Sequence, residues 1–135
     1  MDDALTVARR ACDAADARDW EAYRDCFDER CVYRSGARGT LDREEAVAAD
    51  RAMAEAIDAR VEREAWVGDD HRAAWRWRIT GRHNGEFLGI APTGNAIDVS
   101  GATIASVQHG RITELETFPD RYTLLTQLGV LGTPS

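Results

Sequence analysis

The sequence predicts an α+β fold with an antiparallel sheet, and two observations support this. Up to about residue 60, apolar side chains recur at helical spacing, whereas from Val61 onward they alternate with polar ones. Turn-forming residues separate the alternating segments at short intervals, as in consecutive hairpins. Helices followed by hairpins are typical of the α+β class. A chain of 135 residues is predicted to form one domain, over residues 1–135.

Two helices are expected at the start of the chain. The first has a stripe of small and apolar side chains at three- and four-residue spacing, Leu5, Ala8, Cys12 and Ala15. Asp2 or Asp3 can cap this helix. Asp19 can cap a second, short helix, which carries three aromatic side chains on one side, Trp20, Tyr23 and Phe27.

A short strand and a third helix follow. The β-prone run CVYRS ends in a turn-rich segment, SGARGTLD. Asp42 and Glu45 then have the spacing of a capping box, which predicts a helix that runs to about Ala59. Val47 and residues 53–57 are expected to form its inner face.

Four strands and a terminal helix are predicted from Val61 onward. The strands are expected at residues 61–67, 73–83, 96–107 and 111–118. Three segments are expected to form the turns between these strands: GDDH at residues 68–71, Ala91 to Gly94, and His109–Gly110. The final helix presents three leucines on one face, Leu124, Leu125 and Leu128, and Gly129 is placed to end it.

Composition narrows the classes of function. The net charge is −7 and the chain contains no lysine, which argues against a nucleic-acid partner. No stretch has the roughly 18 apolar residues of a membrane helix, and the acidic start lacks the features of a signal peptide, so a cytoplasmic location is expected. The three cysteines and three histidines match no metal-binding spacing, and no phosphate loop or nucleophile elbow is present. We therefore predict no metal, no disulfide and no cofactor.

One face of the predicted strand 73–83 is a candidate pocket wall. Trp75 and Trp77 share a parity with His83, so the histidine is expected at the end of the same face. Tyr33, in the predicted strand CVYRS, is also expected to line the pocket. The alternative for the tryptophans is an ordinary core position, and the alternative for His83 is a hydrogen-bonded edge residue.

The last strand is expected to bring acids to the same pocket. Glu116 and Phe118 share a parity with Ile112, and Asp120 continues it if the strand extends through Pro119. Glu116 and Asp120 would be roughly 13 Å apart along the strand, too far for a hydrogen-bonded pair. A carboxylate at an apolar pocket has a raised pKa and can accept a proton from carbon next to a carbonyl. Asp120 is the candidate base and His83 the candidate donor, while a simple helix cap is the alternative for Asp120.

The segment from residue 82 to 131 resembles the SnoaL-like polyketide cyclase and ester cyclase family. The similarity rests on a histidine-glycine segment, a turn, a glycine hairpin, an aspartate and a Gln-Leu-Gly tail. The matching residues are His83, Gly85, Phe87, Gly89, Ile90, Pro92, Thr93, Gly94, Gly110, Ile112, Glu114, Asp120, Gln127, Leu128 and Gly129. The first half fits only by its order of helices and strand. Ala91 replaces a proline of the family pattern, and Glu116 replaces its tryptophan.

The resemblance implies a cone-shaped barrel of a curved antiparallel sheet, with N-terminal helices closing one apolar pocket. It also implies a homodimer and a cofactor-independent enzyme in which Asp120 is the base of an intramolecular aldol closure, supported by His83. The expected ligand is a small apolar carbonyl compound. Three alternatives stay open: a non-catalytic binder of a hydrophobic molecule, an interaction module that uses its sheet face, and epoxide hydrolysis, for which the required acids and arginine are not identified.

Overall fold

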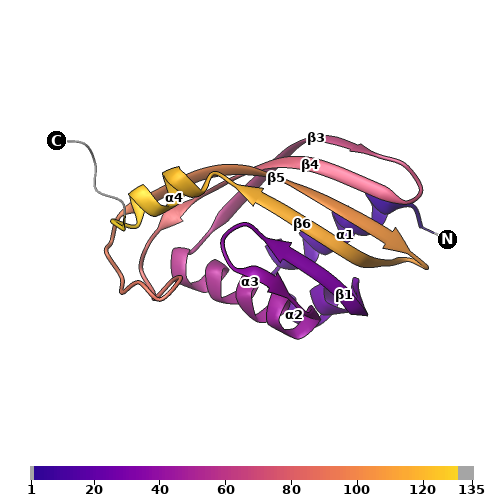
Figure 1. The fold of residues 1–135 in the computed structure, drawn as a ribbon, viewed down its shortest axis with the longest axis horizontal. Helices are drawn as coiled ribbons and strands as arrows, with labels where there is room; N and C mark the ends of the chain where they lie inside the picture. The colour runs from indigo at the N-terminus through magenta and orange to yellow at the C-terminus, as the bar shows by residue number, and fades with distance from the viewer. Residues whose placement is uncertain (1, 131–135) are drawn as a thin grey trace.

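The computed structural model describes residues 2–130, so the ends of the predicted domain, residue 1 and residues 131–135, lie outside the described residues. The chain forms the following elements, shown in Figure 1: α1 (Ala4–Asp16), α2 (Trp20–Asp25), β1 (Phe27–Ser35), β2 (Gly39–Leu41), α3 (Arg43–Ile57), β3 (Arg60–Gly68), β4 (Arg72–Arg82), β5 (Ala96–Gln108), β6 (Arg111–Pro119) and α4 (Arg121–Gln127). The predicted α+β class is confirmed. Within the described part of the chain, no helix is both long and apolar enough to cross a membrane.

All six strands belong to one curved sheet, in the order β2-β1-β6-β5-β4-β3. The sheet does not close on itself, because β2 and β3 are its two edges. Neighbouring strands are antiparallel except for β1 and β6, which run parallel. The expectation of a wholly antiparallel sheet is therefore wrong at this one pairing. A parallel pair needs a long connection, and here residues 36–110, with β2, α3, β3, β4 and β5, connect the two strands.

The helices lie against one face of the sheet (Figure 1). α1 contacts β3, β4, β5 and β6, and α3 contacts β1 and β4. The predicted caps are confirmed: the side chains of Asp3, Asp19 and Asp42 each accept a hydrogen bond at a helix start, and Asp42 forms a capping box with Glu45. α3 ends at Ile57, two residues before the predicted end, because Asp58 adopts a left-handed conformation with φ of 51°.

The observed bounds of the four strands after residue 60 agree with the predicted bounds within one or two residues. The hairpin at His109–Gly110 is also confirmed, with positive φ at both residues. Three features differ from the prediction. β1 begins at Phe27, which was expected on the short helix, and the edge strand β2 was not predicted. The hydrogen-bonded turn before β5 lies at Phe87–Ile90 rather than at Ala91–Gly94.

The core consists of two clusters of buried side chains. The first lies between α1, α2 and the middle of the sheet, and includes Val7, Phe27, Trp75 and Ile112. The second lies between the end of α3, the loop after β4 and α4, and includes Ile57, Phe87, Ile97 and Leu128. The half-buried Trp77 packs against both clusters. The candidate site lies between the clusters, where Trp77 is.

Two glycines let neighbouring groups approach the sheet closely. A Cβ at Gly81 would lie 2.3 Å from the backbone oxygen of Ile57, where the end of α3 crosses β4. A Cβ at Gly101 would lie 2.4 Å from the ring of Trp77. Both distances are far below a normal van der Waals contact, so a side chain at either position would displace the end of α3 or the Trp77 ring.

Candidate functional site

A cavity of about 190 Å³ lies between the helices and the inner face of the sheet. Its lining combines residues from every helix with residues from β1, β3, β4, β5 and β6. Most of the lining is apolar, with Met53, Ile57, Trp75, Trp77, Val99 and Leu115 among the larger side chains. An apolar cavity with a few converging polar groups is the usual form of a small-molecule site.

A carboxyl group with two phenols is the main polar feature of this cavity. Asp50, on the inner side of α3, accepts a hydrogen bond from the hydroxyl of Tyr23 on α2. The hydroxyl of Tyr33 on β1 lies 3.1 Å and 3.3 Å from the two carboxyl oxygens of Asp50. All three side chains line the cavity, and both tyrosines are buried. Two hydrogen bonds leave part of the carboxyl group's accepting capacity free for a ligand.

Burial controls the ionisation of this group of side chains. Desolvation raises the pKa of Asp50 above its usual range, although the Tyr23 and Tyr33 hydroxyls and the positive charge of Arg38 act in the opposite direction. Burial, with the nearby Asp50 charge, also holds the pKa values of both tyrosines well above their usual value. The phenols therefore remain proton donors at neutral pH, while Asp50 is easier to protonate than an exposed aspartate.

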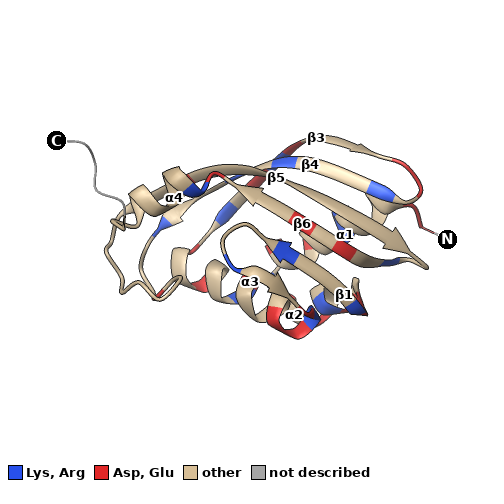
Figure 2. Ribbon diagram, viewed as in Figure 1, with Lys and Arg blue, Asp and Glu red and all other residues tan. Residues whose placement is uncertain are grey.

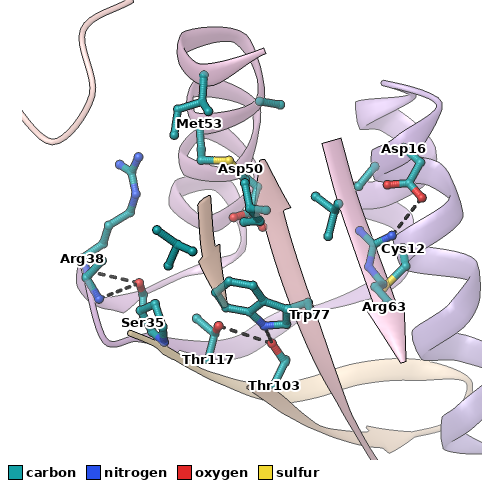
Figure 3. Close-up of a pocket in the computed structure, with 18 of the residues that line it drawn as sticks. Cys12, Asp16, Ser35, Arg38, Asp50, Met53, Arg63, Trp77, Thr103 and Thr117 are labelled. Atoms are coloured by element: carbon teal, nitrogen blue, oxygen red, sulfur yellow. Dashed lines mark hydrogen bonds and ion pairs between the residues drawn. The ribbon is translucent and has the colours of Figure 1, made fainter. Parts of the chain in front are cut away.

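An ion pair lies on the other side of the cavity. Arg63 on β3 donates to Asp16 at the end of α1 at 2.8 Å, and both residues line the cavity. The Cys12 thiol lies beside them, where burial raises its pKa to about 12. Figure 3 shows Arg63 and Asp16 on the opposite side of Asp50 and Trp77 from Arg38. The Cys12 thiol is protonated at neutral pH, so it is not a nucleophile in this environment.

A line of hydrogen bonds fixes the sheet side of the cavity. The indole nitrogen of Trp77 donates to the hydroxyl oxygen of Thr103 at 2.9 Å, and this hydroxyl donates to that of Thr117 at 3.3 Å (Figure 3). The three side chains come from β4, β5 and β6, which are neighbours in the sheet. The bonds hold the Trp77 ring against Gly101, where no side chain obstructs it.

The structure brings together three of the residues that the sequence suggested. Tyr33, Trp75 and Trp77 all line the cavity. Tyr33 also contacts Asp50, which gives it a polar role that the sequence did not indicate. The other four expected site residues do not line the cavity: Asp120, His83, Glu116 and Phe118.

Asp120 caps α4 and is exposed. Its carboxylate accepts hydrogen bonds from the backbone N–H of Thr123 at 3.1 Å and from the Thr123 hydroxyl at 2.7 Å. These bonds lower the pKa of Asp120, the opposite direction from Asp50. Its neighbours Pro119 and Leu124 line the cavity, but Asp120 itself does not. The helix cap weighed from the sequence is thus present.

His83 is completely buried at the end of β4 but does not line the cavity. The backbone N–H of Thr93 donates to its Nδ1 at 3.3 Å, and the Thr93 hydroxyl lies 3.0 Å from the same atom. The roles in the second contact depend on which ring nitrogen carries the proton. Among the described residues, Nε2 has no hydrogen-bond partner. His83 therefore holds the loop after β4 through Thr93.

Glu116 and Phe118 lie on the outer face of the sheet, so the expectation that they share the inner face with Ile112 is wrong. The pairing of β5 with β6 contains a bulge: Val107 pairs with Ile112, and the preceding Ser106 pairs with Glu114. One extra residue reverses the direction of every side chain that follows it in a strand. From this point the inner-face residues of β6 are Leu115, Thr117 and Pro119.

Asp50, Tyr23 and Arg38 were not identified from the sequence. A signal for Asp50 exists, because it lies four residues after the buried Ala46 and four before the buried Ala54, on the apolar face of the predicted helix. A carboxylate within such a stripe is a candidate for a buried acid. Tyr23 was expected on the aromatic side of the short helix but not as a partner of an acid, and no pattern marks Arg38.

The comparisons with known proteins agree with this architecture. The family model described as SnoaL-like polyketide cyclase matches residues 5–128. A candidate SnoaL-like polyketide cyclase from Jannaschia sp. CCS1 superposes with a TM-score of 0.84 at 21% identity, covering 95% of this chain and 92% of that one. AclR, a candidate hydroxylase from Streptomyces galilaeus, gives 0.81 at 21% identity, covering 94% and 96%. IdmH, a candidate polyketide cyclase from Streptomyces antibioticus, gives 0.77 at 24% identity, covering 93% and 97%.

No curated protein sequence matches the chain. The structural neighbours establish the fold, since their identities are below 25%, and their names include both a cyclase and a hydroxylase. The family model covers nearly the whole of the described chain. The chain belongs to the SnoaL-like polyketide cyclase family.

Proposed function

We propose that this protein is a cofactor-independent enzyme that removes a proton next to a carbonyl group of a small apolar molecule, in a reaction of the polyketide cyclase or isomerase type. The observation that carries the proposal is Asp50: a carboxyl group with a raised pKa on the wall of an apolar cavity. Membership of the SnoaL-like family supports this class of chemistry.

In the proposed reaction, ionised Asp50 is the base. The substrate C–H bond next to the carbonyl breaks, its proton forms an O–H bond on Asp50, and the electron pair moves onto the carbonyl oxygen as an enolate. An apolar cavity assists because the carboxylate is poorly solvated there, which makes it a stronger base than an aspartate in water.

The phenols of Tyr23 and Tyr33 are the proposed donors to the enolate oxygen. Both remain protonated because their pKa values are raised. When Asp50 takes up a proton, its need for hydrogen-bond donors falls, so a phenol O–H can turn towards the new negative charge. Tyr33 is the better placed for this change, because it is shared between both oxygens of Asp50 at 3.1 Å and 3.3 Å.

Ring closure follows from the same groups. The enolate carbon attacks a second carbonyl of the same molecule, a C–C bond forms, and the resulting alkoxide takes the proton from Asp50. This step regenerates the ionised carboxylate of Asp50. The overall reaction needs no oxidant and no reductant. Return of the proton to a different carbon would give an isomerase instead.

Two carboxyl groups compete for the role of base in this proposal. The family resemblance assigns it to Asp120, whereas the geometry favours Asp50, because Asp120 is exposed and its pKa is lowered. For His83 we propose a positioning role, since its Nδ1 holds Thr93 in the loop that supplies Phe87 to the cavity.

The test is proton exchange in heavy water. The protein is mixed with a panel of cyclic ketones and β-keto esters, and the loss of the α-proton signal is followed by NMR. Asp50→Asn is expected to lower the exchange rate by at least about a hundredfold, while the matched control Asp120→Asn leaves it unchanged. Circular dichroism and urea unfolding of both variants report whether they fold.

If Asp120→Asn lowers the exchange rate and Asp50→Asn does not, Asp120 is the base, as the resemblance implies. Equal exchange in all three proteins would remove both aspartates from the mechanism. If no ketone exchanges above the buffer rate while ligands still bind, a non-catalytic binder of hydrophobic molecules becomes the better description.

We also propose that the protein forms a homodimer through the outer face of the sheet. Phe118 and Ile104 are 48% and 45% exposed there, on neighbouring strands. Charged residues occur on the strands of this sheet region, with arginines along β4 and acids on β6 (Figure 2). Light scattering should show a dimer that Phe118→Asp dissociates, whereas a monomeric wild type would contradict the proposal.

A further inference from the structure

Arg38 lies at the edge of the cavity, in the connection between β1 and β2. The hydroxyl oxygen of Ser35 accepts hydrogen bonds from the backbone N–H groups of Ala37 at 3.2 Å and Arg38 at 3.1 Å, which fixes this connection (Figure 3). The Arg38 side chain then crosses to the loop after β4, where its guanidinium carbon lies 5.1 Å from the centre of the Phe87 ring. Both Arg38 and Phe87 line the cavity.

The cavity contains two other arginines, and both have protein partners. Arg63 forms an ion pair with Asp16 at 2.8 Å, and Arg18 donates to the backbone oxygen of Ala59 at 2.8 Å. Within residues 2–130, the Arg38 guanidinium forms no ion pair and donates no hydrogen bond. Its nitrogen atoms are not sealed from solvent, since the one buried polar side-chain atom without a partner in this range belongs to His83.

The contact with Phe87 leaves the hydrogen-bonding edge of Arg38 open. A guanidinium group is planar and directs its N–H bonds outward in its own plane, while its face stacks on aromatic rings. The contact with Phe87 places the group, and its donors make no hydrogen bond within residues 2–130, so they are available to a ligand. Two parallel N–H bonds on one edge match the two oxygens of a carboxylate.

The positive charge of Arg38 reaches the chemistry-bearing groups of the cavity. It lowers the pKa values of Asp50 and Tyr33, although burial outweighs it at both. In a chain with 24 acidic and 17 basic residues, an arginine without a carboxylate partner beside an apolar cavity is a favourable place for a negative group of a ligand.

We propose that the substrate is an oxo acid: a molecule with a carboxylate that Arg38 binds, an apolar body that passes Phe87 into the cavity, and a ketone directed towards Asp50. This inference rests on the proposed function and names the class of its substrate. Arg38 is then a specificity-determining residue, because a neutral analogue of the same shape would leave its donors without a partner.

A pair of ligands that differ only in charge tests the inference. 4-Oxo-4-phenylbutanoate and 4-oxo-4-phenylbutanamide share the aryl ketone and differ in carboxylate against carboxamide. Binding is followed by tryptophan fluorescence, since Trp75 and Trp77 line the cavity. We expect the acid to bind wild type roughly tenfold more tightly than the amide, as a charge-assisted hydrogen-bonded pair provides.

Arg38→Gln should remove this preference by weakening the acid about tenfold while changing the amide by less than twofold. Arg76→Gln is the matched control, because Arg76 is an exposed arginine of β4 that does not line the cavity. It should leave both affinities unchanged. Arg38→Lys keeps the charge without the planar edge and is expected to fall between wild type and Arg38→Gln.

Equal affinity of wild type for the two ligands, or no binding of the acid, overturns the inference. Equal weakening of acid and amide by Arg38→Gln also overturns it, because Arg38 would then only hold Phe87 in place. Binding needs no turnover, so its result is independent of the exchange test. A preference for the acid without any proton exchange would support the carboxylate site at Arg38 and contradict the proposed enzyme. Equally fast exchange of acid and amide would support the enzyme and contradict the carboxylate site.

Discussion

Asp50 and Asp120 are the same residue type and both accept hydrogen bonds from hydroxyl groups, yet their pKa values move in opposite directions. Asp50 lies on an apolar cavity with two phenols, and burial raises its pKa. Asp120 lies in solvent at the start of α4, where Thr123 supplies a backbone and a hydroxyl donor, and its pKa is lowered. The number of hydrogen bonds is similar, so the loss of solvent around Asp50 makes the difference.

The comparison shows how one fold can hold one aspartate as an exposed helix cap and another as a buried acid with a raised pKa. A carboxylate with a low pKa is a stable helix cap but a weak base at neutral pH. A carboxylate that solvent stabilises poorly accepts protons more readily, and its neighbours decide where the proton goes next. The predictions below test whether the two aspartates divide these roles.

The largest expected effect is on the pH profile of proton exchange. With Asp50 as the base, kcat/KM for exchange should rise about tenfold per pH unit and level off above a midpoint higher than the usual aspartate range. Asp120→Asn should not move this midpoint. If the midpoint lay below the usual range, it would match the lowered pKa of Asp120 and reverse the assignment.

A second, smaller effect is expected on stability. Because the pKa of Asp50 is higher in the folded than in the unfolded protein, the folded state binds more protons between the two values, and the free energy of unfolding falls as pH rises through that interval. Asp50→Asn lacks this contribution. Its stability relative to wild type should therefore increase from pH 4 upward and become constant above the pKa of folded Asp50.

Urea unfolding of both proteins from pH 4 to pH 8 measures this difference. Asp98, whose pKa the Arg78 guanidinium lowers, contributes with the opposite sign but equally in both proteins, so it cancels. A constant difference across the range would show that Asp50 is not desolvated in the folded protein.

The smallest effect is expected at the helix cap. Asp120→Ala removes the acceptor for Thr123 and should lower the urea midpoint slightly, whereas Asp120→Asn keeps a good capping side chain and should leave it nearly unchanged. Proton exchange should be the same in both variants. A loss of exchange in Asp120→Ala at full stability would contradict a purely structural role.

Local rules in the sequence predicted most of the fold. The caps at Asp3, Asp19 and Asp42 depend on neighbours three residues away, so short-range patterns identify them. The inner face of β4, with Trp75 and Trp77, follows from regular alternation, which no bulge interrupts in the pairing of β4 with β5. The same reasoning fails on β6, because the bulge after Ile112 has no marker in the sequence.

The site was less predictable than the fold, for a physical reason. The surroundings of Asp50 come from distant parts of the chain, since its hydrogen-bond partners Tyr23 and Tyr33 are 27 and 17 residues away. A pKa depends on what surrounds a group in space, and a sequence gives that information only through the fold. The family pattern directed attention to Asp120, but the pattern records an aspartate at that place in the chain and not its exposure.

The parallel pairing of β1 with β6 also determines when the cavity can form. Arg34 of β1 contacts Glu114 of β6, 80 residues later in the chain. Closing so long a loop is slow compared with forming α3 or a hairpin, because chain entropy is lost before the contact stabilises the fold. A nascent chain on the ribosome can therefore hold Asp50 on a finished helix while the far wall of the cavity, Leu115 and Thr117, has not yet been synthesised. Under the proposed function, a newly made chain would gain acid–base chemistry at Asp50 in one late event, when β6 is in place.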